Sequence, residues 1–99
     1  MSRFKLTDQS VDCLAQIYAY IAKDSPHGAE NFLSKLRESV EMQLSVALTI
    51  GRITPELDDP SHREIIYRNY RVLYYIDDSG EKAYITQVQH GAKPLYNKQ

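Results

Sequence analysis

The chain has 99 residues, 42% of them hydrophobic and 25% charged, with a formal net charge of −1. This size and composition fit one globular domain over residues 1–99 and exclude a disordered chain. The near-neutral charge argues against a broad nucleic-acid-binding surface, and the single cysteine, Cys13, excludes an internal disulfide and multi-cysteine metal sites.

The first predicted elements are a short strand and a helix. Residues 3–6 (RFKL) suit an extended segment. Thr7 or Asp8 can then accept hydrogen bonds from the unpaired N–H groups of a first helical turn. Apolar residues follow at the spacings of one helical face: Val11, Leu14, Ile17, Tyr18 and Ile21. They predict a helix of about four turns.

A second helix is predicted over residues 26–47. The segment KDSPHG, residues 23–28, interrupts the first helix. Pro26 suits the first position of a new helix, where its missing N–H is not needed. Two helices joined by so few residues must fold back as an antiparallel hairpin. Their apolar faces need a further surface, which the later strands supply.

Residues 49–62 predict an irregular connection, because glycine and proline punctuate them. Its apolar side chains are expected to pack against the core: Ile50, Ile53 and Leu57. Three acids and one arginine give residues 51–60 a local charge of −2. Such a segment does not favour phosphate binding nearby.

Three antiparallel strands are predicted after this connection. Residues 63–76 (REIIYRNYRVLYYI) form a hairpin that turns near Arg68-Asn69. The turn sequence DDSGE then leads to a last strand over residues 82–90. The expected fold is α+β: an N-terminal strand and an antiparallel helical hairpin packed on one face of a small, mostly antiparallel sheet (β-α-α-β-β-β).

Alternation along residues 70–77 separates two faces of the sheet. The more uniformly apolar face is expected to meet the helices: Tyr70, Val72, Tyr74 and Ile76. Arg71 then lies on the opposite, open face. Either its stem packs beside Tyr75 and its head stays in water, or it forms a preplaced guanidinium for a phosphate or carboxylate.

The last strand and the tail add further basic residues. Residues 82–99 contain three lysines and no acid, a local charge of +3. His90 ends a strand that can pair beside that of Arg71, and Lys93 and Tyr96 follow. These four side chains could grip RNA phosphates and transfer a proton without a metal, or grip an acidic peptide.

Patterns typical of metal and cofactor sites are missing from the sequence. No HExxH, CxxC, Walker or GxGxxG motif occurs, and the three histidines are scattered. We therefore expect no cofactor and no metal. The first residues lack the apolar stretch of a secretion signal, and no apolar run is long enough to span a membrane. A cytoplasmic protein is expected.

Three segments carry a family resemblance: LTDQSVDCLAQIYAYIA, REIIYRNYRVLYYI and YITQVQHGAKPL. Their order is similar to that of ParE/RelE toxins of bacterial type II toxin–antitoxin modules, from about residue 5 to residue 95. The long helical hairpin resembles the ParE branch more than the RelE branch. The ParE resemblance implies plasmid stabilisation and inhibition of DNA gyrase by protein binding, without chemistry of its own. It also implies a cognate antitoxin, ParD-like or another small protein.

The RelE branch is the alternative that this resemblance leaves open. It implies a metal-independent, ribosome-dependent mRNA endonuclease. Arg71 matches an arginine in the central strand of that branch, Lys93 falls near a second basic position, and His90 or Tyr96 could transfer the proton. For partner binding under the ParE branch, we expect Arg71, Tyr75 and Lys93 to contribute. A third interpretation is an interaction module that has lost toxicity.

Overall fold

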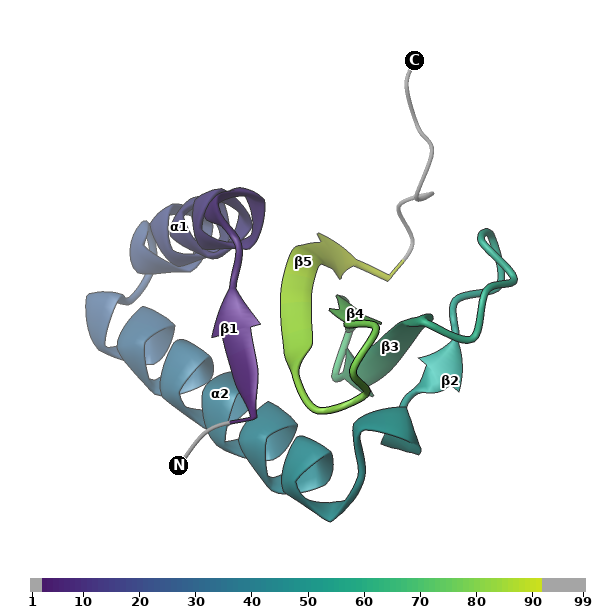
Figure 1. Ribbon diagram of the computed structural model, residues 1–99. Helices are drawn as coiled ribbons and strands as arrows, with labels where there is room; N and C mark the ends of the chain where they lie inside the picture. The colour runs from purple at the N-terminus through teal and green to yellow at the C-terminus, as the bar shows by residue number, and fades with distance from the viewer. Residues whose placement is uncertain (1–2, 92–99) are drawn as a thin grey trace.

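The computed structural model describes residues 3–91. A mixed five-stranded sheet in the order β1-β5-β4-β3-β2 packs with two helices and a short 3₁₀ turn (Figure 1). The strands are β1 (Phe4–Leu6), β2 (Arg52–Ile53), β3 (His62–Tyr67), β4 (Tyr70–Ile76) and β5 (Ala83–His90). The helices are α1 (Asp8–Ala22) and α2 (Pro26–Val46), with η1 (Leu48–Ile50) following. β1 runs parallel to β5 and the other pairs are antiparallel, which confirms the expected α+β fold.

Both helices begin at the residues that the sequence indicates. The Thr7 side chain accepts a hydrogen bond from the Ser10 N–H at 3.2 Å, and α1 follows. Ser25 accepts one from the Gly28 N–H at 2.9 Å, with proline in the first turn of α2. Each cap satisfies one of the N–H groups that a helix start leaves unpaired. These contacts confirm the predicted helical hairpin.

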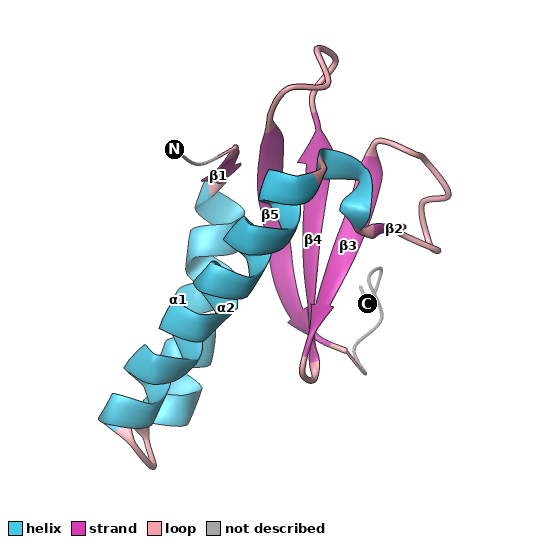
Figure 2. Ribbon diagram, turned by 90° about the horizontal axis from the view of Figure 1, so that it is seen from below, coloured by secondary structure: helices cyan, strands magenta, loops and turns pink. Residues whose placement is uncertain are grey.

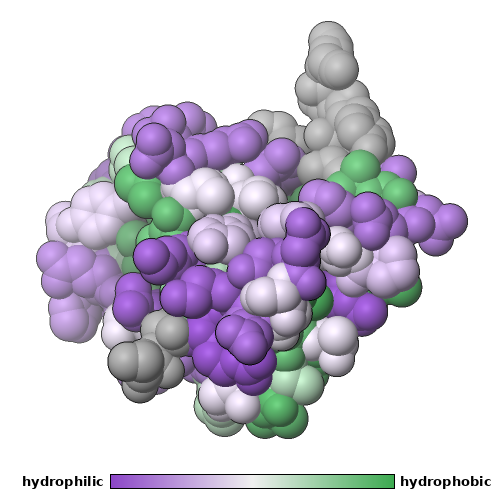
Figure 3. Space-filling view, in the orientation of Figure 1, coloured by the Kyte–Doolittle hydropathy of each residue, from purple (hydrophilic) through white to green (hydrophobic). Residues whose placement is uncertain are grey.

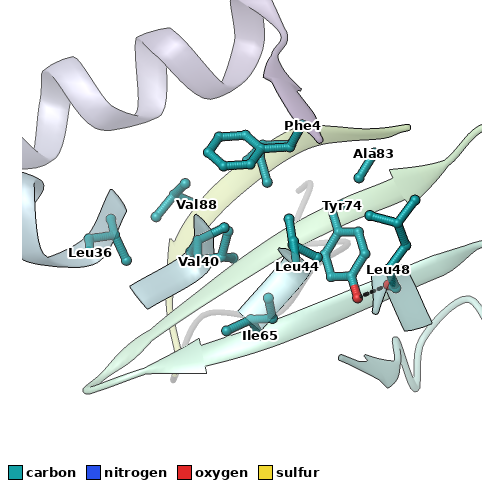
Figure 4. Close-up of a cluster of buried hydrophobic side chains, with 11 residues drawn as sticks. Phe4, Leu36, Val40, Leu44, Leu48, Ile65, Tyr74, Ala83 and Val88 are labelled. Carbon is teal, nitrogen blue, oxygen red and sulfur yellow. Dashed lines mark hydrogen bonds between the residues drawn. The ribbon is translucent and has the colours of Figure 1, made fainter. Parts of the chain in front are cut away.

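The hydrophobic core lies between α2 and the sheet. Figure 2 shows both helices on one face of the sheet, with the end of α2 and η1 crossing its strands. Figure 4 shows the buried side chains, which come from β1, α2, η1 and three strands: Phe4, Leu36, Val40, Leu44, Leu48, Ile65, Val72, Tyr74, Ala83, Ile85 and Val88. α1 covers the edge of this core with half-buried residues, and its one fully buried residue is Ser10. α2 is therefore the helix that closes the core.

A β-bulge in β5 keeps its apolar residues on the helix side. Leu73 is paired with Gln87 and Tyr74 with Ile85, so Thr86 has no partner residue in β4. Ile85 and Val88 are both buried, although a spacing of three residues would place them on opposite faces of a regular strand. The extra residue resets the alternation between them.

The turn predicted near Arg68-Asn69 lies between β3 and β4, and its positive-φ residue is Arg68, at 53°. One expectation about the connections was wrong. Of the apolar residues in the connection after α2, Ile50, Ile53 and Leu57 are 42%, 37% and 37% exposed and are not part of the core. In this part of the chain the residue that is buried in the core is Leu48 of η1.

Apolar residues are also exposed at the end of α2. Figure 3 shows hydrophobic surface where α2 ends and η1 begins, and the side chains there that are most exposed are Met42 and Val46. Within residues 3–91, neither helix combines the length and hydrophobicity needed to cross a membrane.

Candidate functional site: a buried ion cluster on the outer sheet face

Arg71 is buried on the sheet face that points away from the helices. The residue is only 7% exposed, so the interpretation of a solvated guanidinium was wrong. Its Nε donates to Glu64 Oε1 at 3.0 Å, and its NH2 group donates to the same oxygen at 2.7 Å. Glu64 lies on the adjacent strand β3, and its side chain is fully buried. A buried carboxylate thus fixes the inner edge of the guanidinium.

A second carboxylate reaches Arg71 from the connection between β2 and β3. Glu56 Oε2 and Oε1 accept from the NH1 and NH2 groups of Arg71 at 3.0 and 2.7 Å, a bidentate pair. The other oxygen of Glu64 accepts from Arg52 Nε at 2.5 Å. We call these four side chains, Arg52, Glu56, Glu64 and Arg71, the ion cluster.

The charges of the ion cluster balance. Two guanidinium groups face two carboxylates, and the hydrogen bond to Glu56 is the largest reason that the pKa of Arg71 lies above its ordinary value. Desolvation of Arg71 opposes this shift, but the bonds and charges of the two carboxylates outweigh it. Arg71 is therefore a permanently charged group whose bound anions belong to the same chain.

His90 lies close to Arg71 in the sheet but on its other face. In the β4–β5 register, Arg71 is opposite Gln89, and His90 is opposite Tyr70. The rings of His90 and Tyr70 lie 5.6 Å apart in an edge-on contact, and Tyr70 packs against the helix-side core. Arg71 and His90 both border a hollow of about 330 Å³ at the end of the sheet. The other two residues of the nuclease alternative, Lys93 and Tyr96, lie outside the described residues.

Tyr75 shares the outer face with Arg71, two positions beyond Leu73 on β4. Its ring lies 5.1 Å from that of His62, and its hydroxyl is 3.5 Å from Asp78. The charge of Asp78 is the largest cause that raises the pKa of the Tyr75 hydroxyl. Tyr75 thus belongs to an aromatic and acidic surface. Lys93, the third residue predicted to bind a partner, lies outside the residues that the structure describes.

Sequence patterns alone did not single out the two glutamates. Glu56 lies 15 residues before Arg71 in an irregular connection, and no local pattern joins them. Glu64 offered a weak signal, because it is a charged residue within the strand-like run REIIY. Residues 3–91 contain no group of three or more His, Cys, Asp or Glu side chains placed to hold a metal ion.

Comparison with models of known protein families identifies the family of this chain. The model of the ParE toxin of the type II toxin–antitoxin system parDE matches residues 4–95. The chain belongs to the ParE toxin family. The solved structure of the chromosomal ParDE toxin–antitoxin system of P. aeruginosa matches with a TM-score of 0.68 at 20% identity, covering 91% of this chain and 96% of that one. No curated protein matches this ParE-family chain.

A RelE-type structure also shares the fold. The toxin–antitoxin complex RelBE2 of Mycobacterium tuberculosis matches with a TM-score of 0.56 at 18% identity, covering 90% of this chain and 96% of that one. At these identities the two structures establish the common fold of this ParE-family chain and leave its target open.

Proposed function

We propose that this ParE-family chain is a toxin that inhibits DNA gyrase by binding to it, and that a small cognate antitoxin neutralises it. The observation that carries the proposal is the state of Arg71. Its guanidinium is held by Glu56 and Glu64, so an RNA phosphate approaching it would meet two carboxylates. Such an arrangement supports a protein-binding role more than cleavage of RNA.

The antitoxin part of the proposal draws on the outer sheet face and on the related structures. The ParDE and RelBE2 structures are described as a toxin–antitoxin system and a toxin–antitoxin complex. In the present chain, Tyr75 and Ile66 leave aromatic and apolar surface beside the ion cluster. A small protein can dock on such a surface by strand addition or by packing an extended segment.

A specific observation also favours the RelE-type alternative. Arg71 and His90 border one hollow at the end of the sheet, and the fold is shared with RelBE2. In this alternative the chain cleaves mRNA at the ribosome, with Arg71, His90, Lys93 and Tyr96 as the acting residues. Glu56 would then have to leave Arg71 before phosphate could bind.

Two assays on the purified chain separate these functions. In a gyrase supercoiling reaction, the gyrase proposal expects loss of supercoiling as the chain is added. In a ribosome-programmed mRNA cleavage reaction, it expects intact mRNA. Cut mRNA with unaffected supercoiling would overturn the proposal. For the antitoxin, co-expression with the product of the adjacent small reading frame should relieve growth arrest, and unchanged arrest would contradict it.

A further inference from the structure

The two carboxylates that bind Arg71 differ in how firmly they are held. Glu64 is on a paired strand, its side chain is fully buried, and both its oxygens accept hydrogen bonds from arginines. Glu56 comes from the connection between β2 and β3, and its side chain is 27% exposed. The inner edge of the guanidinium is thus fixed within the sheet, while its outer edge is closed by a residue from an exposed segment.

The charge balance shows what could replace Glu56. Without it, two arginines share one buried carboxylate, which leaves the ion cluster with a net charge of +1. The NH1 group and one N–H of the NH2 group of Arg71 then lose the acceptors that Glu56 provides, while NH2 still donates to Glu64. A second carboxylate would restore neutrality and match the planar fork of the guanidinium. A phosphate monoester or inorganic phosphate, with a charge of about −1.5 to −2, would leave an excess negative charge beside buried Glu64.

We propose that Arg71 forms a carboxylate-binding site that Glu56 fills in the isolated chain, and that an acidic side chain of a protein partner takes the place of Glu56 by exchange. Arg71 stays oriented during the exchange because Glu64 continues to hold its inner edge. The proposal rests on the proposed function only in that the ligand of Arg71 is a protein partner rather than an RNA phosphate.

The surroundings of the site define the partner segment further. Ile66 is directly opposite Arg71 in the β3–β4 register and is 51% exposed. Leu57 follows Glu56 in the connection and is 37% exposed. Apolar surface therefore flanks the guanidinium, and a partner segment with a glutamate or aspartate beside apolar residues would cover both kinds of surface.

The test follows the Nε–Hε resonance of Arg71 by nuclear magnetic resonance, using the full chain. Acetate is the carboxylate probe, and inorganic phosphate is the comparison anion. Glu56→Gln removes the internal carboxylate with little change of shape. Asp58→Asn is the matched control, because it removes one charge from the same connection, and asparagine tolerates its positive φ of 49°.

Acetate is expected to shift the Arg71 resonance saturably in Glu56→Gln at a concentration about tenfold lower than in the unmodified chain and in Asp58→Asn. The reason is that an intramolecular carboxylate competes at an effective concentration of about millimolar or higher. Phosphate is expected to bind Glu56→Gln more weakly than acetate. Equal acetate titrations in all three chains, or tighter binding of phosphate, would overturn the carboxylate site.

A peptide arm tests the protein source of the carboxylate. The probes are a blocked pentapeptide with a central glutamate between leucines and its counterpart with a central glutamine. The glutamate peptide is expected to bind Glu56→Gln about tenfold more tightly than the glutamine peptide, as one charge-assisted bidentate pair allows. Equal binding of the two peptides would overturn the exchange. The supercoiling assay is a separate readout, so failure of gyrase inhibition would be distinguishable from failure of the site.

Discussion

Replacing Tyr74 by phenylalanine tests how η1 is joined to the sheet. Tyr74 is 1% exposed, and its hydroxyl lies between Leu48, the first residue of η1, and Gly51, the residue that follows η1. The hydroxyl donates to the Leu48 carbonyl oxygen at 2.6 Å and accepts from the Gly51 N–H at 3.0 Å (Figure 4 shows the first bond). Phenylalanine keeps the ring and removes both bonds.

The expected loss follows from the two backbone groups that the substitution leaves unpaired. A buried donor or acceptor that loses its partner costs about 1–3 kcal/mol. Two such groups, with some relaxation of the turn, give an expected loss of about 2–4 kcal/mol in the free energy of unfolding. Domains of this size have a free energy of unfolding of about 5–15 kcal/mol in total. The Tyr74→Phe chain is therefore expected to remain folded but with much lower stability.

Urea denaturation followed by circular dichroism measures this loss. Tyr20→Phe is the matched control, because Tyr20 is 70% exposed and its hydroxyl is accessible to water. The control is expected to change the free energy of unfolding by less than about 0.5 kcal/mol. Equal effects of the two substitutions would refute the argument that the Tyr74 hydroxyl holds η1 against the sheet.

Three further predictions concern stability. Glu64→Gln leaves a buried guanidinium with less charge compensation and should lower the free energy of unfolding, measured by urea denaturation, by about 3–5 kcal/mol. Removal of Arg52, the other partner of Glu64, should lower it by less than about 1 kcal/mol, because the Arg52 side chain is 61% exposed. Gly51→Ala places a Cβ 2.6 Å from the Glu64 carbonyl oxygen and should lower the thermal midpoint, with a cost of about 1–3 kcal/mol. The hydrogen bond from Ser79 lowers the pKa of Asp77 in the folded chain, so the stability it contributes at neutral pH should be lost as the pH falls below about 4. Acid titration of Asp77→Asn should lack this part of the loss.

The helices could be predicted because their signals are local. Ser25 and Pro26 mark the start of α2 within a few residues, and the apolar spacing marks its buried face. Alternation in β4 likewise placed Tyr74 toward the helices and Arg71 away from them. These predictions needed no knowledge of distant residues.

The ion cluster and the bulge could not be predicted because they depend on tertiary register. Glu56 meets Arg71 only after the connection between β2 and β3 has folded over the outer sheet face. The bulge at Thr86 becomes visible only when β4 and β5 are paired. Ile50 looked like a core residue from composition, but Ile50 is 42% exposed and Leu48, two residues earlier, is the residue buried in the core. Local pattern gives the elements, whereas contacts between distant elements decide which charged groups become buried.

The position of β5 has a consequence for the synthesis of the chain. β5 lies between β1 and β4, so strands from both ends of the sequence meet in the sheet (Figure 1). Until residues 83–90 have left the ribosome, β1 has no neighbouring strand, and the core lacks Ile85 and Val88. Contacts over such sequence separations form late in folding. A polypeptide that ends before residue 83 would therefore lack the strand that joins β1 to β4, and its sheet could not be completed.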